Sequence, residues 1–186
     1  MSYQLLVIGA SVGGSKAITA ILKELPPDFP TPIAIVLHRA KKVESLSQFF
    51  QKNCVLTVVE VQDKMVFQPG YVYLAPADYH LIVDKLCFSL SLDEPIHFAR
   101  PSIDVLFESA ADSLRNRAIG ILLTGSNSDG AEGLLLMKLC GGHTIVEDPR
   151  TAECKIMPES ALKLGAATQI LPLNKMPGYL IGLVQG

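Results

Sequence analysis

The chain has little net charge and no long apolar runs, and each of these features excludes a class of protein. Its 16 basic and 18 acidic side chains leave a formal net charge of −2. It therefore lacks the broad basic surface that dominates affinity for nucleic acid. The longest apolar runs, such as residues 32–37 and 118–123, are far too short to cross a bilayer. Neither nucleic-acid binding nor membrane insertion is expected.

Cysteine pairs and clustered metal ligands are also missing. Cys54, Cys87, Cys140 and Cys154 form no C-x-x-C motif, which favours reduced thiols in a cytosolic protein over disulfides or a metal site. The four histidines show no ligand spacing. The N-terminus lacks the basic region and cleavage site of an export signal. We expect a cytoplasmic protein that needs no metal and no other cofactor.

Apolar runs alternate with segments of helical spacing along most of the chain. With 186 residues, 49% of them hydrophobic, the sequence can bury one core, so a single domain over residues 1–186 is expected. The alternation predicts an α/β fold with a doubly wound, mainly parallel sheet flanked by helices. The predicted strands are 4–9, 33–37, 56–61, 118–123, 143–147 and 167–171, and the predicted helices are 14–25, 44–52, 103–117, 131–140 and 158–164.

The pattern changes between residues 65 and 92. Short alternating segments, "MVFQPGYVYLAP", "YHLIV" and "LCFSLSL", are separated by turn residues. This arrangement predicts antiparallel hairpins. Beyond them, Pro101 and a capping Ser102 open the helix predicted over 103–117.

A glycine-rich loop, Gly9 to Gly14, joins the first predicted strand to its helix. Such a turn lets a ligand approach backbone N–H groups at a helix N-terminus, which suits a phosphate or an oxyanion equally well. The dinucleotide hypothesis is the weaker one, because the spacing departs from G-x-G-x-x-G and the second strand ends in His38 rather than an acidic residue. No tyrosine has a lysine four positions on, as short-chain reductases require.

The same loop places Ser11 at the carboxyl end of a buried strand, where it can serve as a nucleophile. His38 ends the next strand, and Asp129 lies in the loop after residues 118–123. In a doubly wound sheet these loops can meet at one edge, so the three residues can form a catalytic triad. The order Ser, His, Asp and the absence of a G-x-S-x-G motif argue against the α/β-hydrolase fold. Each residue alone is more often structural, but together they favour a site.

Six phrases in order resemble the catalytic domain of the chemotaxis protein-glutamate methylesterase family, CheB. They are "VIGASVGG", "IVLH", "PGYVYLAPADYHL", "RPSIDVLFESAA", "ILLTGSNSDGAEGL" and "MPESALKLGAA". The resemblance implies hydrolysis of glutamyl methyl esters on the cytoplasmic helices of chemoreceptors, with release of methanol, and deamidation of receptor glutamines. It places the family's serine, histidine and aspartate on Ser11, His38 and Asp129.

The resemblance also suggests secondary roles and points to departures. Backbone N–H groups around Val12 and Ser126 are expected to meet the oxyanion, and Arg100 either contacts an acidic substrate segment or makes a surface salt bridge. Asp104 is expected to be structural, at the start of its own helix. Val12 replaces the family's usual threonine, and Ser126-Asn127-Ser128 replaces Met-Gly-Asn/Asp. The basic cluster of Arg39, Lys41 and Lys42 is either a solvated loop or a device that steers substrate.

The family enzyme usually carries an N-terminal receiver domain, and this chain starts at the catalytic strand. We therefore expect methylated chemoreceptor helices as partners, with a separate receiver or response-regulator domain as a further candidate. Two alternatives stay open because of the altered loops. One is an esterase or amidase acting on another carboxyl derivative, and the other is a non-catalytic signalling module on the same fold.

Overall fold

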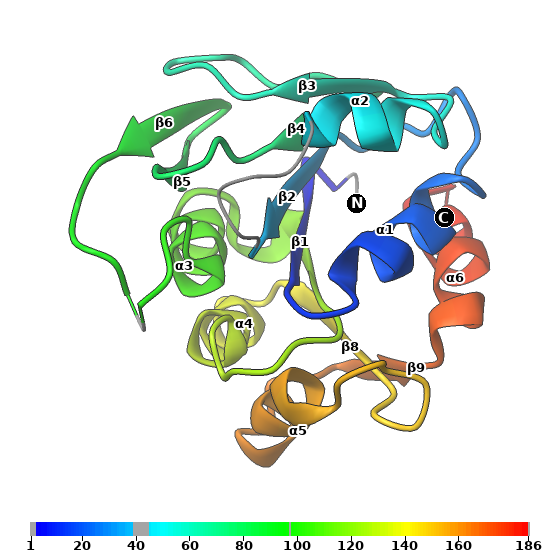
Figure 1. The fold of residues 1–186 in the computed structure, drawn as a ribbon. Helices are drawn as coiled ribbons and strands as arrows, with labels where there is room; N and C mark the ends of the chain where they lie inside the picture. The colour runs from blue at the N-terminus through cyan, green and yellow to red at the C-terminus, as the bar shows by residue number, and fades with distance from the viewer. Residues whose placement is uncertain (1–2, 39–44, 97, 186) are drawn as a thin grey trace.

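The computed structural model describes residues 3–38, 45–96 and 98–185. Seven strands form one parallel sheet in the order β3-β4-β2-β1-β7-β8-β9, and β5 and β6 form a separate antiparallel pair (Figure 1). The strands are β1 Leu5–Ala10, β2 Ile33–Leu37, β3 Thr57–Glu60, β4 Tyr71–Leu74, β5 His80–Asp84, β6 Cys87–Ser91, β7 Ala118–Leu122, β8 His143–Glu147 and β9 Gln169–Leu171. The helices are α1 Gly14–Leu22, α2 Leu46–Gln51, α3 Ile103–Leu114, α4 Ala131–Leu139, α5 Ile156–Lys163 and α6 Met176–Gln185, with 3₁₀ turns at Arg115–Arg117 and Leu173–Lys175. The predicted α/β class is confirmed.

The central strand β1 is buried on both faces, which is why its sequence is continuously apolar. Its side chains alternate between two cores: Leu5 and Val7 pack with α3, α4 and α5, whereas Leu6 and Ile8 pack with α1, α2 and α6. Figure 1 shows these two groups of helices on opposite sides of the sheet. The sheet is thus the middle layer of three.

The region of residues 65–92 differs in part from its prediction. The hairpin of β5 and β6 is antiparallel, as expected. Strand β4 instead enters the main sheet between β2 and β3 and runs parallel to both. Its alternating "YVYL" reflects two different cores rather than one solvated face, because Tyr73 packs in the core with the hairpin while Val72 and Leu74 pack in the other.

The C-terminal helix α6 has no counterpart among the predicted elements. Its Met176 and Leu180 are fully buried in the core that α1 shares. Within the described ranges, no helix combines the length and the apolarity needed to span a membrane.

The order of strands brings the predicted loops together. Strand β1 pairs with β2 on one side and with β7 on the other, so the chain reverses its winding direction at β1. In open α/β sheets ligands bind outside the carboxyl ends of the strands at such a switch point. The loops that carry Ser11, His38 and Asp129 all leave the sheet at this place.

Close packing of α3 against α4 depends on Gly133, and this contact can be tested. A Cβ atom there would lie 2.8 Å from the Asp104 carbonyl oxygen and 2.8 Å from the Phe107 Cβ. Gly133→Ala should therefore lower the free energy of unfolding by about 1–3 kcal/mol in urea denaturation, as overpacking does. The control is Gly182→Ala in the exposed part of α6, where a Cβ meets nothing within 4 Å. It should be neutral or stabilising by up to about 1 kcal/mol, and equal losses in both variants would contradict this account of the packing.

Candidate functional site

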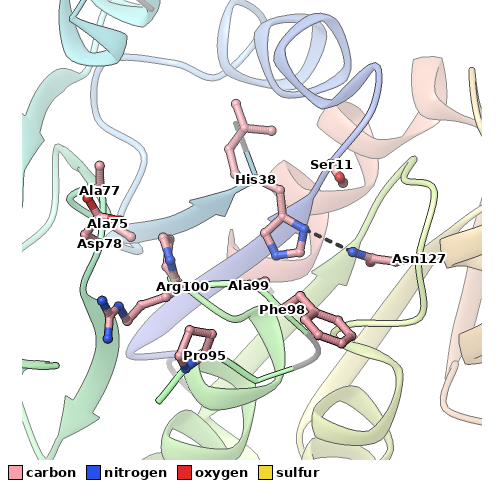
Figure 2. A pocket seen from close by; sticks show the side chains of 12 residues that line it. Ser11, His38, Ala75, Ala77, Asp78, Pro95, Phe98, Ala99, Arg100 and Asn127 are labelled. Carbon is pink, nitrogen blue, oxygen red and sulfur yellow. Dashed lines mark hydrogen bonds between the residues drawn. The ribbon is translucent and has the colours of Figure 1, made fainter. Parts of the chain in front are cut away.

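A cavity of about 540 Å³ opens at the carboxyl ends of β1, β2 and β4. Ser11, His38 and Asn127 line it together with Arg100 and Phe98. In Figure 2, Ser11, His38 and Asn127 lie on one side of the cavity, and Asp78 and Arg100 lie on the other. The cavity therefore receives groups from five separate stretches of the chain.

Ser11 follows β1 directly and is held by backbone hydrogen bonds on both sides. Its N–H donates to the carbonyl of Thr124 at 2.9 Å, and its own carbonyl accepts from the N–H of Gly14 at 2.8 Å. Gly125 permits this close approach of the two loops, since a Cβ there would lie 3.0 Å from the Ser11 Cβ. The turn after β1 is thus fixed to the loop after β7.

Hydrogen bonds of Thr124 and Glu147 stabilise this junction. The Thr124 hydroxyl donates to the Val12 carbonyl at 2.8 Å and accepts from the Cys154 N–H at 2.8 Å. The Thr124 N–H donates to the Glu147 carboxylate at 2.9 Å. Glu147 is buried, and burial raises the pKa of its carboxyl. No sequence motif marks Glu147, which is recognisable only as the last residue of a predicted strand.

His38 and Asp129 are paired, although 91 positions separate them. The Nε2 atom of His38 lies 2.8 Å from Oδ2 of Asp129, and the His38 N–H donates to the Ala10 carbonyl, which fixes the backbone beside β1. At the other ring nitrogen, the Asn127 amide Nδ2 lies 3.4 Å from Nδ1 (Figure 2). Among the described residues, no hydrogen bond joins Ser11 to His38; such contacts often tighten only when substrate binds.

The orientation of Asn127 follows from its other contact. Its Oδ1 accepts the N–H of Asp129 at 3.2 Å, which leaves its NH₂ group toward His38 and the cavity. In the sequence Asn127 is recognisable only as a departure from the family pattern, and only the structure places its side chain against the imidazole.

The carboxylate of Asp129 occupies the N-terminus of α3. It accepts the Ile103 N–H at 2.7 Å, the Asp104 N–H at 3.0 Å and the Ser102 hydroxyl at 2.8 Å. Its burial would raise its pKa, but the hydrogen bonds from His38 and from these three donors outweigh burial and lower it. Asp129 is therefore held as an anion by a helix terminus that favours negative charge.

Asp104 makes the reciprocal contact. It was expected to serve its own helix, but its carboxylate accepts the N–H of Gly133 in the first turn of α4 at 2.7 Å. Asp129, in the loop before α4, thus caps α3, while Asp104, in the first turn of α3, caps α4. Burial, and then the nearby charge of Asp129, raise the pKa of Asp104 to about 6.

The remaining predicted site residues lie nearby. Arg100 lines the cavity, and its Nη1 donates to the carbonyls of Leu92 and Asp93 at 2.9 and 3.0 Å. Val12 and Ser126 are exposed beside Ser11 and Asn127. The basic cluster of residues 39–42 lies outside the described residues. Across the ranges that the structure describes, no three His, Cys, Asp or Glu side chains gather as metal ligands.

The raised pKa of Asp104 predicts a specific dependence of stability on pH. Between about pH 4 and 6 the carboxyl stays protonated in the folded chain while it ionises in the unfolded chain, so stability falls as pH rises through this window. Asp104→Asn keeps an acceptor for Gly133 and removes this loss, which is about 2–3 kcal/mol for such a shift. Urea denaturation at pH 4.5 and 7 should show a smaller decrease for Asp104→Asn than for wild type or for Asp112→Asn, on the exposed side of α3. Parallel behaviour of all three proteins would contradict the prediction.

Comparison with known proteins gives a consistent assignment. The model of the CheB methylesterase family matches residues 6–180. A provisionally named protein-glutamate methylesterase/protein-glutamine glutaminase of Leptospira interrogans is 42% identical over all of this chain and 97% of its own length. The same-named enzymes of Vibrio vulnificus and Thermotoga maritima are 38% and 36% identical, and the chain spans about half of their length (54% and 55%). The crystal structure of the Thermotoga maritima CheB methylesterase catalytic domain superposes with a TM-score of 0.93 at 35% identity, over 99% of this chain and 100% of that one. The chain belongs to the CheB methylesterase family.

Proposed function

We propose that this chain is a serine hydrolase that removes methyl esters from glutamate side chains of chemoreceptors, releases methanol, and also deamidates receptor glutamines. The observation that carries the proposal is the hydrogen bond of 2.8 Å between His38 and Asp129, beside Ser11 in an open cavity. The names of the relatives, protein-glutamate methylesterase/protein-glutamine glutaminase, supply the substrate class.

The contacts of His38 determine which nitrogen acts as the base. Asp129 is anionic and can only accept, so Nε2 of the neutral imidazole carries the hydrogen and Nδ1 presents the lone pair. Nδ1 takes the proton of Ser11 as its Oγ attacks the ester carbonyl carbon. The tetrahedral intermediate then breaks its bond to the methoxy group, which leaves as methanol with the proton from Nδ1.

Deacylation repeats the sequence with water in place of Ser11. Nδ1 accepts a proton from water, the resulting hydroxide attacks the acyl carbon, and Ser11 Oγ leaves with that proton to give a free glutamate carboxyl. The negative charge of Asp129 stabilises the imidazolium that forms in both halves. An amide in place of the ester releases ammonia by the same steps.

Two groups near Ser11 have proposed parts in these steps. Asn127 must turn from Nδ1 before Ser11 can donate to it, and the contact of 3.4 Å is long enough to break at small cost. The backbone N–H groups of Val12 and Ser126 are the proposed donors to the oxyanion, as they lie on the two loops that the Thr124 contacts fasten together.

The first experiment is methanol release from methylated chemoreceptor cytoplasmic fragments. Ser11→Ala and His38→Ala should lower kcat by about 10³-fold or more, and Asp129→Asn by about 10²-fold or more. Ser15→Ala, on the first turn of α1, should retain wild-type activity. A folded wild-type chain that releases no methanol from several receptors would overturn the methylesterase proposal and favour another carboxyl substrate or a binding role.

Arg100 provides a test of how the substrate is held. Its guanidinium is anchored on two carbonyls at the cavity wall, so its remaining N–H groups can donate to an acidic receptor segment without a large ordering cost. Arg100→Met should raise KM for the receptor fragment about 10-fold, with less than a threefold change in kcat. Turnover of a small neutral ester should not change. A fall in kcat with unchanged KM would contradict a binding role.

A further inference from the structure

Two fully buried residues, Ser102 and His80, lie behind the Asp129–His38 pair. We propose that Ser102, held in place by His80, is a positioning residue that fixes the Asp129 carboxylate and joins it to the wall of the cavity. This inference rests on the proposed function, because it assigns Ser102 to the machinery that activates Ser11. From the sequence, Ser102 is expected only to cap its helix.

The hydroxyl of Ser102 has one proton, and the carboxylate receives it. Ser102 Oγ donates to Asp129 Oδ1 at 2.8 Å, and an Oγ lone pair accepts the Val105 N–H at 3.4 Å. The cap predicted at Ser102 is thus confirmed, but the shorter and charge-assisted contact is the one with Asp129. Ser102 and Asp129 are both completely buried, so water cannot replace either partner.

The backbone of Ser102 is fixed by His80. Nδ1 of His80 accepts the Ser102 N–H at 3.2 Å, which places the ring hydrogen on Nε2. Nε2 in turn donates to the Glu94 carbonyl at 3.1 Å. His80 is 1% exposed, and both of its nitrogens have partners.

Glu94 precedes Pro95, and Pro95 and Arg100 line the cavity. Hydrogen bonds thus connect the segment beside the cavity to the backbone of Ser102 through His80, and the Ser102 hydroxyl to Asp129 and its partner His38.

The hydrogen bonds from His38, the Ser102 hydroxyl and the N–H groups of Ile103 and Asp104 divide evenly between the two oxygens of Asp129. Oδ2 accepts the Ile103 N–H and pairs with His38, whereas Oδ1 accepts the Ser102 hydroxyl and the Asp104 N–H. Removal of the Ser102 hydroxyl takes away the hydroxyl donor to Oδ1, the shorter of these two contacts. The carboxylate can then rotate, and the imidazole that it orients loses the alignment needed to take the proton of Ser11.

Labelling of Ser11 by a fluorophosphonate tests this without any receptor substrate. Ser102→Ala should lower the rate constant of inactivation, kinact, about 10-fold, and KI should change less than twofold. Ser102→Thr restores a hydroxyl and should recover most of the rate.

The matched control is Ser109→Ala on the same helix. The Ser109 hydroxyl accepts the Val83 N–H and donates to the Val105 carbonyl, so its loss also destabilises α3, but it does not touch Asp129. Its kinact should equal that of wild type. If Ser102→Ala loses no more rate than Ser109→Ala, the proposal is overturned.

His80 is tested by a pair of variants. Asn can place its Oδ1 near the position of the imidazole Nδ1 and accept the Ser102 N–H, whereas Leu cannot. His80→Leu should therefore lower kinact about 10-fold, and His80→Asn by less than threefold. Equal rates in the two variants would show that His80 does not act through Ser102.

Proton NMR separates failure of this inference from failure of the proposed function. The imidazole N–H proton between His38 and Asp129 should shift in Ser102→Ala and stay in place in Ser109→Ala, whether or not Ser11 reacts. Wild-type chain that is not labelled would overturn the role of Ser11 in the proposed function. An N–H proton that is unmoved in Ser102→Ala would overturn the positioning role of Ser102.

Discussion

The arrangement of the site depends on one interaction, the binding of the Asp129 carboxylate at the N-terminus of α3. A buried carboxylate is costly unless donors satisfy it, and here the first N–H groups of the helix, the Ser102 hydroxyl and His38 all do so. The same contacts that keep Asp129 ionised also fix its direction. A helix terminus is a rigid donor because its N–H groups are aligned by the helix itself.

That interaction also determines how α3 and α4 pack. Asp129 lies two residues before α4 and binds the N-terminus of α3, and Asp104 of α3 in turn binds the first turn of α4. The exchange places two carboxylates close together in the interior, and only one of them has its pKa lowered. The charge of Asp129 is one of the causes of the raised pKa of Asp104. Ionised Asp129 therefore contributes to the loss of folding stability that is complete above about pH 6.

Burial limited what the pattern of apolar residues could predict. Strands β1, β2 and β7 were recognisable because both of their faces are covered and their sequences are continuously apolar. Strand β4 alternates like a half-exposed strand, since its two faces meet cores of different composition, and it was therefore assigned to a hairpin. Helix α6 was not predicted, because it begins with Met-Pro-Gly, a sequence typical of a turn. In the structure its Leu180 is fully buried in the core.

By itself the sequence determined which chemical groups follow which strands: a serine after the first, a histidine after the second and an aspartate after the strand at 118–123. Those positions, with the strand order of a doubly wound sheet, were enough to predict that Ser11, His38 and Asp129 lie at one edge. Only the tertiary structure decided that His38 contacts Asp129 through Nε2 and that Asn127 lies beside Nδ1. It also decided that Ser102 binds the Asp129 carboxylate and that His80 binds the Ser102 backbone. These contacts depend on side-chain direction and loop conformation, which are set by packing between segments up to 91 positions apart and leave no periodic trace in the sequence.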